Sequence, residues 1–378
     1  MAWLAKKVGT LRRVAQRYGV SGVASVLADK VHPITQPVTD YVKLIPAAAV
    51  LLARHGRPAR FFNAVGAGIG DDLLLTAVFR ELHRRGRGDD WVRTTRPELY
   101  HHNDDVPVVV PPLERFDVLL KRLGTSVVYP WYTSYHPAFD RDDPTPEQHL
   151  ISIMCQKAGI TGTITLRPYL HLTEEEMRRG ALAPRQVAIM SSGLDAKHAM
   201  RNKNWSLEKY QGVVSALRDR YDLVQVGSRS DPSLEGALDL RGNTSLRETA
   251  AVLHGSLAFV GQVGFLMHLA RAVDCRAVIV YGGRETPAQS GYRCNENLYS
   301  AVHCSPCWRL NTCPYDRMCL EKIHVYDVIE ALDRQVARFG TTLEVDTDTI
   351  THELIVRNAE RYEQAVEAHQ LAWAALYE

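Results

Sequence analysis

The sequence contains no apolar run long enough to cross a membrane as a helix, which takes about 20 residues. Its longest strongly apolar run, residues 44–53, is half that length and includes a proline. A secretory leader is also missing, because Arg17 interrupts the apolar stretch that would have to follow Arg12 and Arg13. We therefore expect a cytoplasmic protein, neither integral to a membrane nor exported.

The composition lacks the extremes that mark non-globular chains. Hydrophobic residues make up 46% and charged residues 23% of the 378 residues, with 25 glycines and 18 prolines. These proportions exclude an intrinsically disordered chain, a collagen-like repeat and a small disulfide scaffold. At about 150 residues per domain, the length predicts two or three domains, each with room for a hydrophobic core.

Net charge is small over the whole chain, at +2, but it is unevenly distributed. Residues 1–60 contain ten lysines or arginines and two aspartates, so this segment carries +8 and the remainder −6. Within it, residues 3–18 place apolar side chains at helical spacing, which predicts an amphipathic helix. We expect this basic arm to dock on the anionic inner membrane, or alternatively to pack on the protein itself. Nucleic acid is not expected as a partner, because aromatic side chains do not interleave with the basic ones.

From residue 60 onward, short apolar segments alternate with helical patterns. The alternation stops at a linker between Pro168 and Pro184 and starts again at residue 187. This pattern predicts an α/β protein with two doubly wound parallel-sheet domains facing a cleft. Capping boxes at Thr173–Glu176 and Ser245–Glu248 mark two helix starts. We expect a basic helical arm over 1–58, one α/β domain over 59–180, a second over 181–335 and a helical tail over 336–378.

A glycine-rich turn, GAGIGD, follows a predicted strand at 60–65 and precedes a predicted helix. Asp71 occupies the place of the third glycine of a dinucleotide motif, and its charge together with that of Asp72 would repel a diphosphate. A helix start instead keeps an aspartate ionised, which suits a general base. Asp71 is therefore the candidate base, with two simple helix caps as the alternative interpretation.

A basic loop follows the predicted strand at 187–190. Lys197, Arg201 and Lys203 lie in it, beyond the carboxyl end of that strand, where ligands of doubly wound folds bind. Such cations can neutralise the phosphates of a nucleotide leaving group. An ordinary solvated loop is the alternative.

Two D-x-D patterns, Asp140–Asp142 and Asp346–Asp348, would be needed by a metal-dependent nucleotide-sugar enzyme. Neither pair follows a segment whose pattern clearly predicts a strand. We therefore expect no catalytic metal.

Four of the seven cysteines fall within sixteen residues, at Cys304, Cys307, Cys313 and Cys319. Four thiolates at such spacing can close a tetrahedral site for zinc or iron. We expect one structural ion that orders the long loop from 291 to 320. Free thiols or disulfides are the alternative.

Several segments together resemble glycosyltransferase family 9, the bacterial ADP-heptose:lipopolysaccharide heptosyltransferases. The cysteine-rich segment also resembles the iron-bound finger of the branch that glycosylates autotransporter proteins. The resemblance covers about residues 60–335. The matching segments follow the family's order, at 69–82, 93–103, 202–210, 240–253, 259–273, 281–287 and 303–323.

This resemblance implies a GT-B fold and an inverting, metal-independent transfer. It implies that Asp71 is the base and that Lys203 contacts the donor diphosphate. The chain departs from the family where an aspartate usually precedes Met-His, since Val263 stands in its place, although His268 is retained. The donor-binding residues expected on these grounds are Ser191, Ser192, Lys203, Thr244, Gly261, Gly264, His268 and Gly283.

The function expected is transfer of a heptose or hexose from a nucleoside-diphosphate donor to a cell-envelope glycan such as lipopolysaccharide core. A protein acceptor is the first alternative. A catalytically silent GT-B binding or assembly protein is the second, because of the missing aspartate. A homo-oligomer is compatible with each of these three functions.

Overall fold

The computed structural model describes residues 44–65, 68–130, 132, 145–196, 199–354, 356–357 and 360. Two compact units are present: Met1–Phe61 with Pro112–Val127, and Phe62–Pro111 with Val128–Glu378. The predicted amphipathic helix at 3–18 lies outside the described residues. Within the described ones, every helix is too short or too polar to span a bilayer.

The smaller unit contains a helix over 44–55 and α3 (Phe116–Arg122). Leu44 and Ala48, one helical turn apart, are buried. Phe61 meets Phe116 edge-on, with ring centroids 5.4 Å apart. The boundary between the units passes through β1 (Arg60–Asn63) and β4 (Ser126–Val128).

The first sheet has four strands in the order β3-β2-β1-β4. Strand β2 (Asp90–Arg93) pairs in parallel with β3 (Val108–Val110). After β1, the chain turns into α2 (Ile69–Arg84), whose residues 72–79 are all buried. The remaining elements before the second sheet are η1 (Pro97–Tyr100), α4 (Leu150–Lys157), β5 (Gly162–Thr165) and α5 (Glu174–Gly180).

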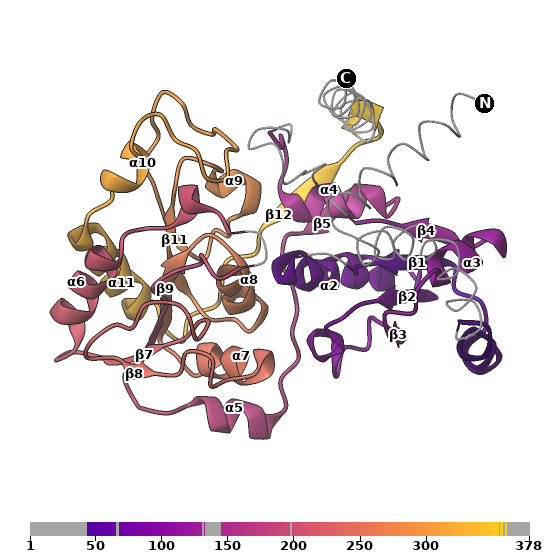
Figure 1. Ribbon diagram of the computed structural model, residues 1–378, viewed down its shortest axis with the longest axis horizontal. Helices are drawn as coiled ribbons and strands as arrows, with labels where there is room; N and C mark the ends of the chain where they lie inside the picture. Colours follow the sequence, from indigo (N-terminus) through magenta and orange to yellow (C-terminus); the bar gives the residue numbers. More distant parts are fainter. Residues whose placement is uncertain are drawn as a thin grey trace, which may run out of the picture. The chain divides into compact units, whose positions relative to one another are not determined.

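The second sheet has six parallel strands in the order β11-β10-β9-β6-β7-β8 (Figure 1). Renumbered from its first strand, this order is 3-2-1-4-5-6, that of the dinucleotide-binding doubly wound fold. The predicted fold class is confirmed. The strands are β6 (Gln186–Ile189), β7 (Asp222–Gln225), β8 (Leu238–Asp239), β9 (Ala258–Gln262), β10 (Ala277–Tyr281) and β11 (Glu296–Tyr299).

Helices cover both faces of this sheet, α6 and α11 on one and α7 and α8 on the other (Figure 1). Strands β9 and β10 are buried along their whole length, as expected for a sheet covered on both sides. The helices and turns are η2 (Arg201–Lys203), α6 (Leu207–Leu217), α7 (Leu246–His254), α8 (Phe265–Ala272), α9 (Pro287–Ser290), α10 (Met318–Glu321) and α11 (Val325–Ala337).

Both capping boxes form as predicted. Thr173 accepts a hydrogen bond from the Glu176 backbone N–H at 3.2 Å, and Glu176 accepts one from the Thr173 backbone N–H at 2.8 Å. Ser245 and Glu248 exchange the same pair of bonds at the start of α7. These local bonds fix where α5 and α7 begin, because they satisfy N–H groups that have no partner inside the helix.

The chain returns to its first half near the C-terminus. Strand β12 (Thr347–Ile350) pairs antiparallel with β5, within the segment expected to be a helical tail. The pairing residues alternate between exposed and less exposed positions, as in a strand with one covered face. The short sequence TDTI lacks the apolar run that would have predicted it.

Candidate active site

The carboxyl edge of the six-stranded sheet is defined here as the loops after β6, β7, β9 and β10. Between β6 and β9 the strand order reverses, which is where ligands of this fold bind. Ser192 follows β6 there, and its hydroxyl lies 3.2 Å from Oδ1 of Asn204. Gly264 precedes α8, and no atom lies within 4 Å of where a Cβ would be, so the backbone is open to a ligand.

Asp71 lies at the third position of α2, with its carboxylate turned back to the helix start. Its Oδ2 accepts a hydrogen bond from the Gly68 backbone N–H at 3.2 Å. The side chain is half-buried, so it remains within reach of a substrate. A capping bond and the helix dipole both favour the ionised form that a general base needs.

Asp72, one residue further on, has different surroundings. It is fully buried and accepts hydrogen bonds from the hydroxyls of Thr94 and Tyr100, with Arg96 at 3.6 Å. Burial raises the pKa of Asp72, and these three partners oppose that rise. Asp72 therefore anchors the segment 94–100 to α2.

Lys203, in η2, forms a buried ion pair with Glu285 in the loop after β10. The Arg284 guanidinium lies 3.7 Å from the same Glu285 oxygen. Burial alone would raise the pKa of Glu285, but Lys203 and Arg284 outweigh it and hold the pKa below its ordinary value. Burial lowers the pKa of Lys203, and Glu285 opposes that effect.

The start of α2, which carries Asp71, packs on the start of α8, where a Cβ at Gly70 would lie 3.6 Å from Phe265 and His268. Burial lowers the pKa of Lys203, and the Asp71 carboxylate is one of the groups that oppose this shift. Tyr132 completes the group with a hydrogen bond to Asp71. Burial, together with the Asp71 and Glu285 carboxylates, raises the pKa of Tyr132 well above its ordinary value. The roles that the sequence predicts for Asp71 and Lys203 stay predictions.

His268 is buried in α8 beside the start of α2. Its Nδ1 lies 2.7 Å from the hydroxyl of Tyr292, and burial lowers the pKa of His268 to about 3. His149 lies against the same tyrosine, with ring centroids 5.8 Å apart, and burial lowers its pKa to about 4. Both imidazoles are therefore neutral at physiological pH.

Other predicted donor residues are engaged within the protein. The Ser191 hydroxyl bonds the carbonyl of Pro232 at 2.5 Å, and Thr244 pairs with Thr249 at 2.9 Å. Gly261 packs so closely on Phe259 and Met190 that no Cβ would fit. At Gly283 a Cβ would overlap Ser305, so this glycine accommodates the cysteine-rich segment.

The four clustered cysteines lie in the segment between β11 and α11. Burial raises the pKa of Cys307, and the charges of Cys304, Cys319 and Cys313 raise it further. Cys319 accepts a hydrogen bond from the Gly283 N–H at 3.0 Å, and Cys313 accepts one from Arg317 at 3.3 Å. Among the described residues, no three His, Cys, Asp or Glu side chains are arranged to hold a metal ion.

Some predicted residues do not join the cluster around Lys203. Lys197 and the Asp140–Asp142 pair lie outside the described residues. Asp346 is buried and accepts hydrogen bonds from the Arg293 N–H at 3.0 and 3.1 Å. It therefore serves to hold the chain before β12.

Sequence reasoning missed Glu285, Arg284 and Tyr132. The first two lie in the YGGRETP segment, from which the sequence analysis names only Gly283 as a site residue. A charged pair directly after the last fully buried strand was the available signal, since that position faces the ligand edge. Tyr132 had no signal, because its partner Asp71 is distant in sequence.

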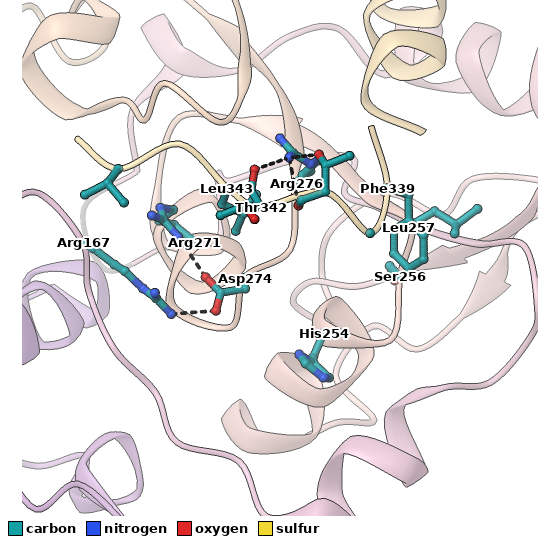
Figure 2. Close-up of a pocket in the computed structure, with 13 residues that line it drawn as sticks. Arg167, His254, Ser256, Leu257, Arg271, Asp274, Arg276, Phe339, Thr342 and Leu343 are labelled. Atoms are coloured by element: carbon teal, nitrogen blue, oxygen red, sulfur yellow. Dashed lines mark hydrogen bonds and ion pairs between the residues drawn. The ribbon is translucent and has the colours of Figure 1, made fainter. Parts of the chain in front are cut away.

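A cavity of about 520 Å³ lies at the other end of the sheet, next to the starts of β9 and β10 (Figure 2). Arg167 and Arg271 both point to Asp274, at 2.7 and 2.9 Å, as Figure 2 shows. Arg276 donates to the carbonyls of Thr341 and Thr342 at 3.2 and 3.0 Å. These arginines fasten the segment 339–345 to the sheet.

Comparisons with known proteins bear on the family and the fold of this chain. The family model for glycosyltransferase family 9 (heptosyltransferase) matches residues 168–317, which confirms the resemblance. No curated protein matches the sequence.

Three solved structures share the fold. One is E. coli ADP-heptose LPS heptosyltransferase II, with TM-score 0.55, 14% identity and coverage of 74% of this chain and 98% of that chain. Another is the iron-containing dodecameric glycosyltransferase TibC from enterotoxigenic E. coli, with TM-score 0.57, 15% identity and coverage of 74% of this chain and 76% of that chain. The third is the glycosyltransferase family 9 protein of Veillonella parvula, with TM-score 0.51, 13% identity and coverage of 74% of this chain and 97% of that chain. The fold is thus the GT-B fold of heptosyltransferases.

Proposed function

We propose that this chain, whose residues 168–317 match the family 9 (heptosyltransferase) model, transfers heptose from a nucleoside-diphosphate donor to a cell-envelope glycan such as lipopolysaccharide core. The transfer inverts the anomeric carbon and uses no catalytic metal. The observation that supports this proposal is geometric: the start of α2, which carries Asp71, packs on the start of α8 after β9, and Lys203 is ion-paired to Glu285 in the loop after β10.

The proposed chemistry follows from these two side chains. Asp71 accepts the proton of the acceptor hydroxyl while the hydroxyl oxygen bonds to the anomeric carbon. The bond from that carbon to the diphosphate oxygen breaks, and the nucleoside diphosphate leaves with the electron pair. Lys203 stabilises the charge that develops on this leaving group, a role that a divalent ion fills in metal-dependent transferases.

The donor is proposed to bind between the loops after β6 and β9. A structure of TibC holds ADP-D-beta-D-heptose, and that protein shares the fold of this chain. The open backbone at Gly264 and the Ser192 hydroxyl are the groups we propose for donor contacts there. His268 would support the site as a neutral group bonded to Tyr292.

The proposal is tested by following the release of ADP from ADP-D-beta-D-heptose, with a heptose-deficient lipopolysaccharide core as acceptor. Asp71→Asn should fold and bind ADP but lose about 100-fold or more in turnover. Activity in excess EDTA should match that without it. Turnover that requires magnesium, or an Asp71→Asn protein of normal rate, would contradict the mechanism.

The same assay separates the alternative acceptors. Transfer to a protein passenger domain and not to the glycan would identify a protein glycosyltransferase. No donor turnover with either acceptor, despite ADP binding, would identify a silent binding protein. The chain's Val263, in place of the usual aspartate, is what keeps this last alternative open.

We also propose a structural zinc or iron ion at Cys304, Cys307, Cys313 and Cys319. The donor chemistry supports it, because Cys307, Cys313 and Cys319 each accept a backbone N–H bond, as metal-bound thiolates commonly do. TibC, which shares the fold, contains iron. The ion would order the segment around Trp308 and take no part in the transfer. Elemental analysis should find about one zinc or iron per chain.

Two further proposals concern where the protein works. The basic segment 1–60 would bring it to the inner membrane, so deletion of residues 1–20 should abolish salt-sensitive binding to anionic vesicles. A homo-oligomer is proposed because TibC is dodecameric. The mass of the purified protein in solution measures this directly.

A further inference from the structure

The cysteine-rich segment, residues 303–320, contacts both loops that carry the charged groups of the site. One of these loops is η2, which contains Lys203, and the other is the turn after β10, which contains Arg284 and Glu285. Charged side chains on loops are free to move unless something holds the loops. The contacts described next show what holds them.

Asn202, the neighbour of Lys203, is bound almost entirely by the cysteine-rich segment. It is 4% exposed, and its backbone N–H bonds the Leu310 carbonyl at 3.0 Å. Its side-chain amide donates to the carbonyls of Thr312 and Arg309 at 2.9 and 3.2 Å. Its amide oxygen accepts from Nε of Arg317 at 3.2 Å. Asn202 therefore fixes the backbone from which Lys203 projects.

The turn after β10 is held from the same side. The Gly283 carbonyl accepts a bond from the Cys307 N–H at 2.8 Å, and the Arg284 carbonyl accepts one from the Trp308 N–H at 3.0 Å. A Cβ at Gly282 would overlap the Asn202 carbonyl oxygen, so a glycine is needed for the two loops to meet.

A chain of contacts then links Trp308 to Lys203. The Arg284 guanidinium lies over the Trp308 ring, 4.1 Å from its centroid. Arg284 lies 3.7 Å from Glu285, and Glu285 is paired with Lys203. Trp308, Arg284 and Glu285 are at most 4% exposed, so the chain of contacts is shielded from water. A buried cation over an indole ring has a preferred geometry, which the ring imposes on the guanidinium.

We propose that Asn202 and Trp308 are positioning residues for Lys203, through which the cysteine-rich segment sets the geometry of the diphosphate site. Asn202 holds the backbone of Lys203, and Trp308 holds its charged partner through Arg284. The proposal rests on the proposed role of Lys203 toward the diphosphate. It gives the cysteine-rich segment a part in donor binding in addition to its part in folding.

The test measures ADP affinity by calorimetry, and kcat and KM for ADP-D-beta-D-heptose, in full-length variants. Asn202→Ala and Trp308→Leu should each weaken ADP binding about tenfold, because a displaced lysine loses much of its interaction with the phosphates. Trp308→Phe should recover most of the affinity, since a phenyl ring still offers a face to Arg284. The indole N–H of Trp308 has no hydrogen-bond partner among the described residues, so this change breaks no such bond.

The matched control is Val328→Ala, which removes core volume from α11 in the same domain. It should lower the melting temperature as the other variants do while leaving ADP affinity unchanged. Equal ADP affinity in Asn202→Ala, Trp308→Leu and this control would overturn the inference. So would a failure of Trp308→Phe to bind better than Trp308→Leu.

Lys203→Ala separates this inference from the proposed function. If Lys203→Ala weakens ADP binding but Asn202→Ala does not, the positioning role alone is wrong. If Lys203→Ala binds ADP normally, the proposed role of Lys203 fails and the inference fails with it. Weaker ADP binding in Lys203→Ala, Asn202→Ala and Trp308→Leu, with recovery in Trp308→Phe, supports both the proposed role of Lys203 and the positioning role.

Discussion

The two ends of the six-stranded sheet both bury positive charge, but they use it differently. At the amino end, beside the cavity of Figure 2, Arg276 donates to backbone carbonyls of residues 341 and 342. At the carboxyl edge, Lys203 and Arg284 share a single carboxylate, that of Glu285. The carboxylates at the two ends differ in exposure: the Asp274 side chain that pairs with Arg167 and Arg271 is 47% exposed, whereas the Glu285 side chain is 2% exposed. Only the ion pair at the carboxyl edge is shielded from water, where its interaction with a phosphate would be strong.

This difference shows that a cluster of cations does not by itself mark a ligand site. The amino-end cavity contains Arg167, Arg271 and Arg276 and would be chosen on charge alone. Arg167 and Arg271 are bound to the Asp274 carboxylate, and Arg276 donates to the Thr341 hydroxyl. Their contacts serve stability, while the role we propose for Lys203 is in the reaction.

The largest expected effect is at the carboxyl edge. Lys203→Ala should lower turnover about 100-fold, because a preorganised charge at the leaving group is lost. Arg276→Ala should leave turnover unchanged and lower the free energy of unfolding, since Thr341 and Thr342 lose their buried partner. Steady-state kinetics and urea unfolding of both variants check this. An equal loss of turnover in Lys203→Ala and Arg276→Ala would contradict the distinction between the two ends of the six-stranded sheet.

An intermediate effect is expected at Asp72, which resembles the amino-end arginines in having complete partners. Asp72→Ala should lower the free energy of unfolding by about 2 kcal/mol, because the buried Thr94 hydroxyl loses its acceptor and the Tyr100 hydroxyl keeps only the backbone carbonyl of residue 72. ADP affinity should remain normal. Asp71→Ala is the matched control, and its unfolding free energy should change by less than about 1 kcal/mol, as expected for a helix cap.

The smallest effect concerns Glu176, which binds Arg247 through two oxygens at 2.6 and 2.7 Å. These bonds lower the pKa of Glu176 from 4.5 to about 2, although burial opposes the shift. Because the folded-state pKa is depressed, the contribution is complete above about pH 5 and is lost as the pH falls toward 2. We expect about 1 kcal/mol, reduced by solvent screening. Unfolding of the wild type and Glu176→Gln at pH 6 and pH 3 measures it, and a difference that is the same at both pH values would contradict it.

Much of the fold could be predicted from local signals. The capping boxes at Thr173 and Ser245 predicted the starts of α5 and α7. The apolar runs at 187–190 and 277–281 predicted β6 and β10. The short strands β11 and β12 could not be predicted, because their residues are only partly apolar and their stability comes from pairing with distant strands.

The candidate site could be predicted only in part, for a related reason. Asp71 and Lys203 follow predicted strands, so their place at the ligand edge was expected. Which of Asp71 and Asp72 is buried could not be told from the sequence, because α2 is buried on nearly all sides. Glu285 was missed because its partner Lys203 is 82 positions earlier, and no periodicity reports such a pair.

The pairing of β12 with β5 has a consequence for how the chain is ordered. Strand β5 precedes the whole six-stranded sheet in the sequence, and β12 follows it, yet the two form one two-stranded antiparallel sheet. A chain that ended before Thr347 would leave the backbone N–H and C=O groups of residues 162–165 without this partner. The order of β5 therefore depends on a segment that is synthesised only after every strand of the second sheet.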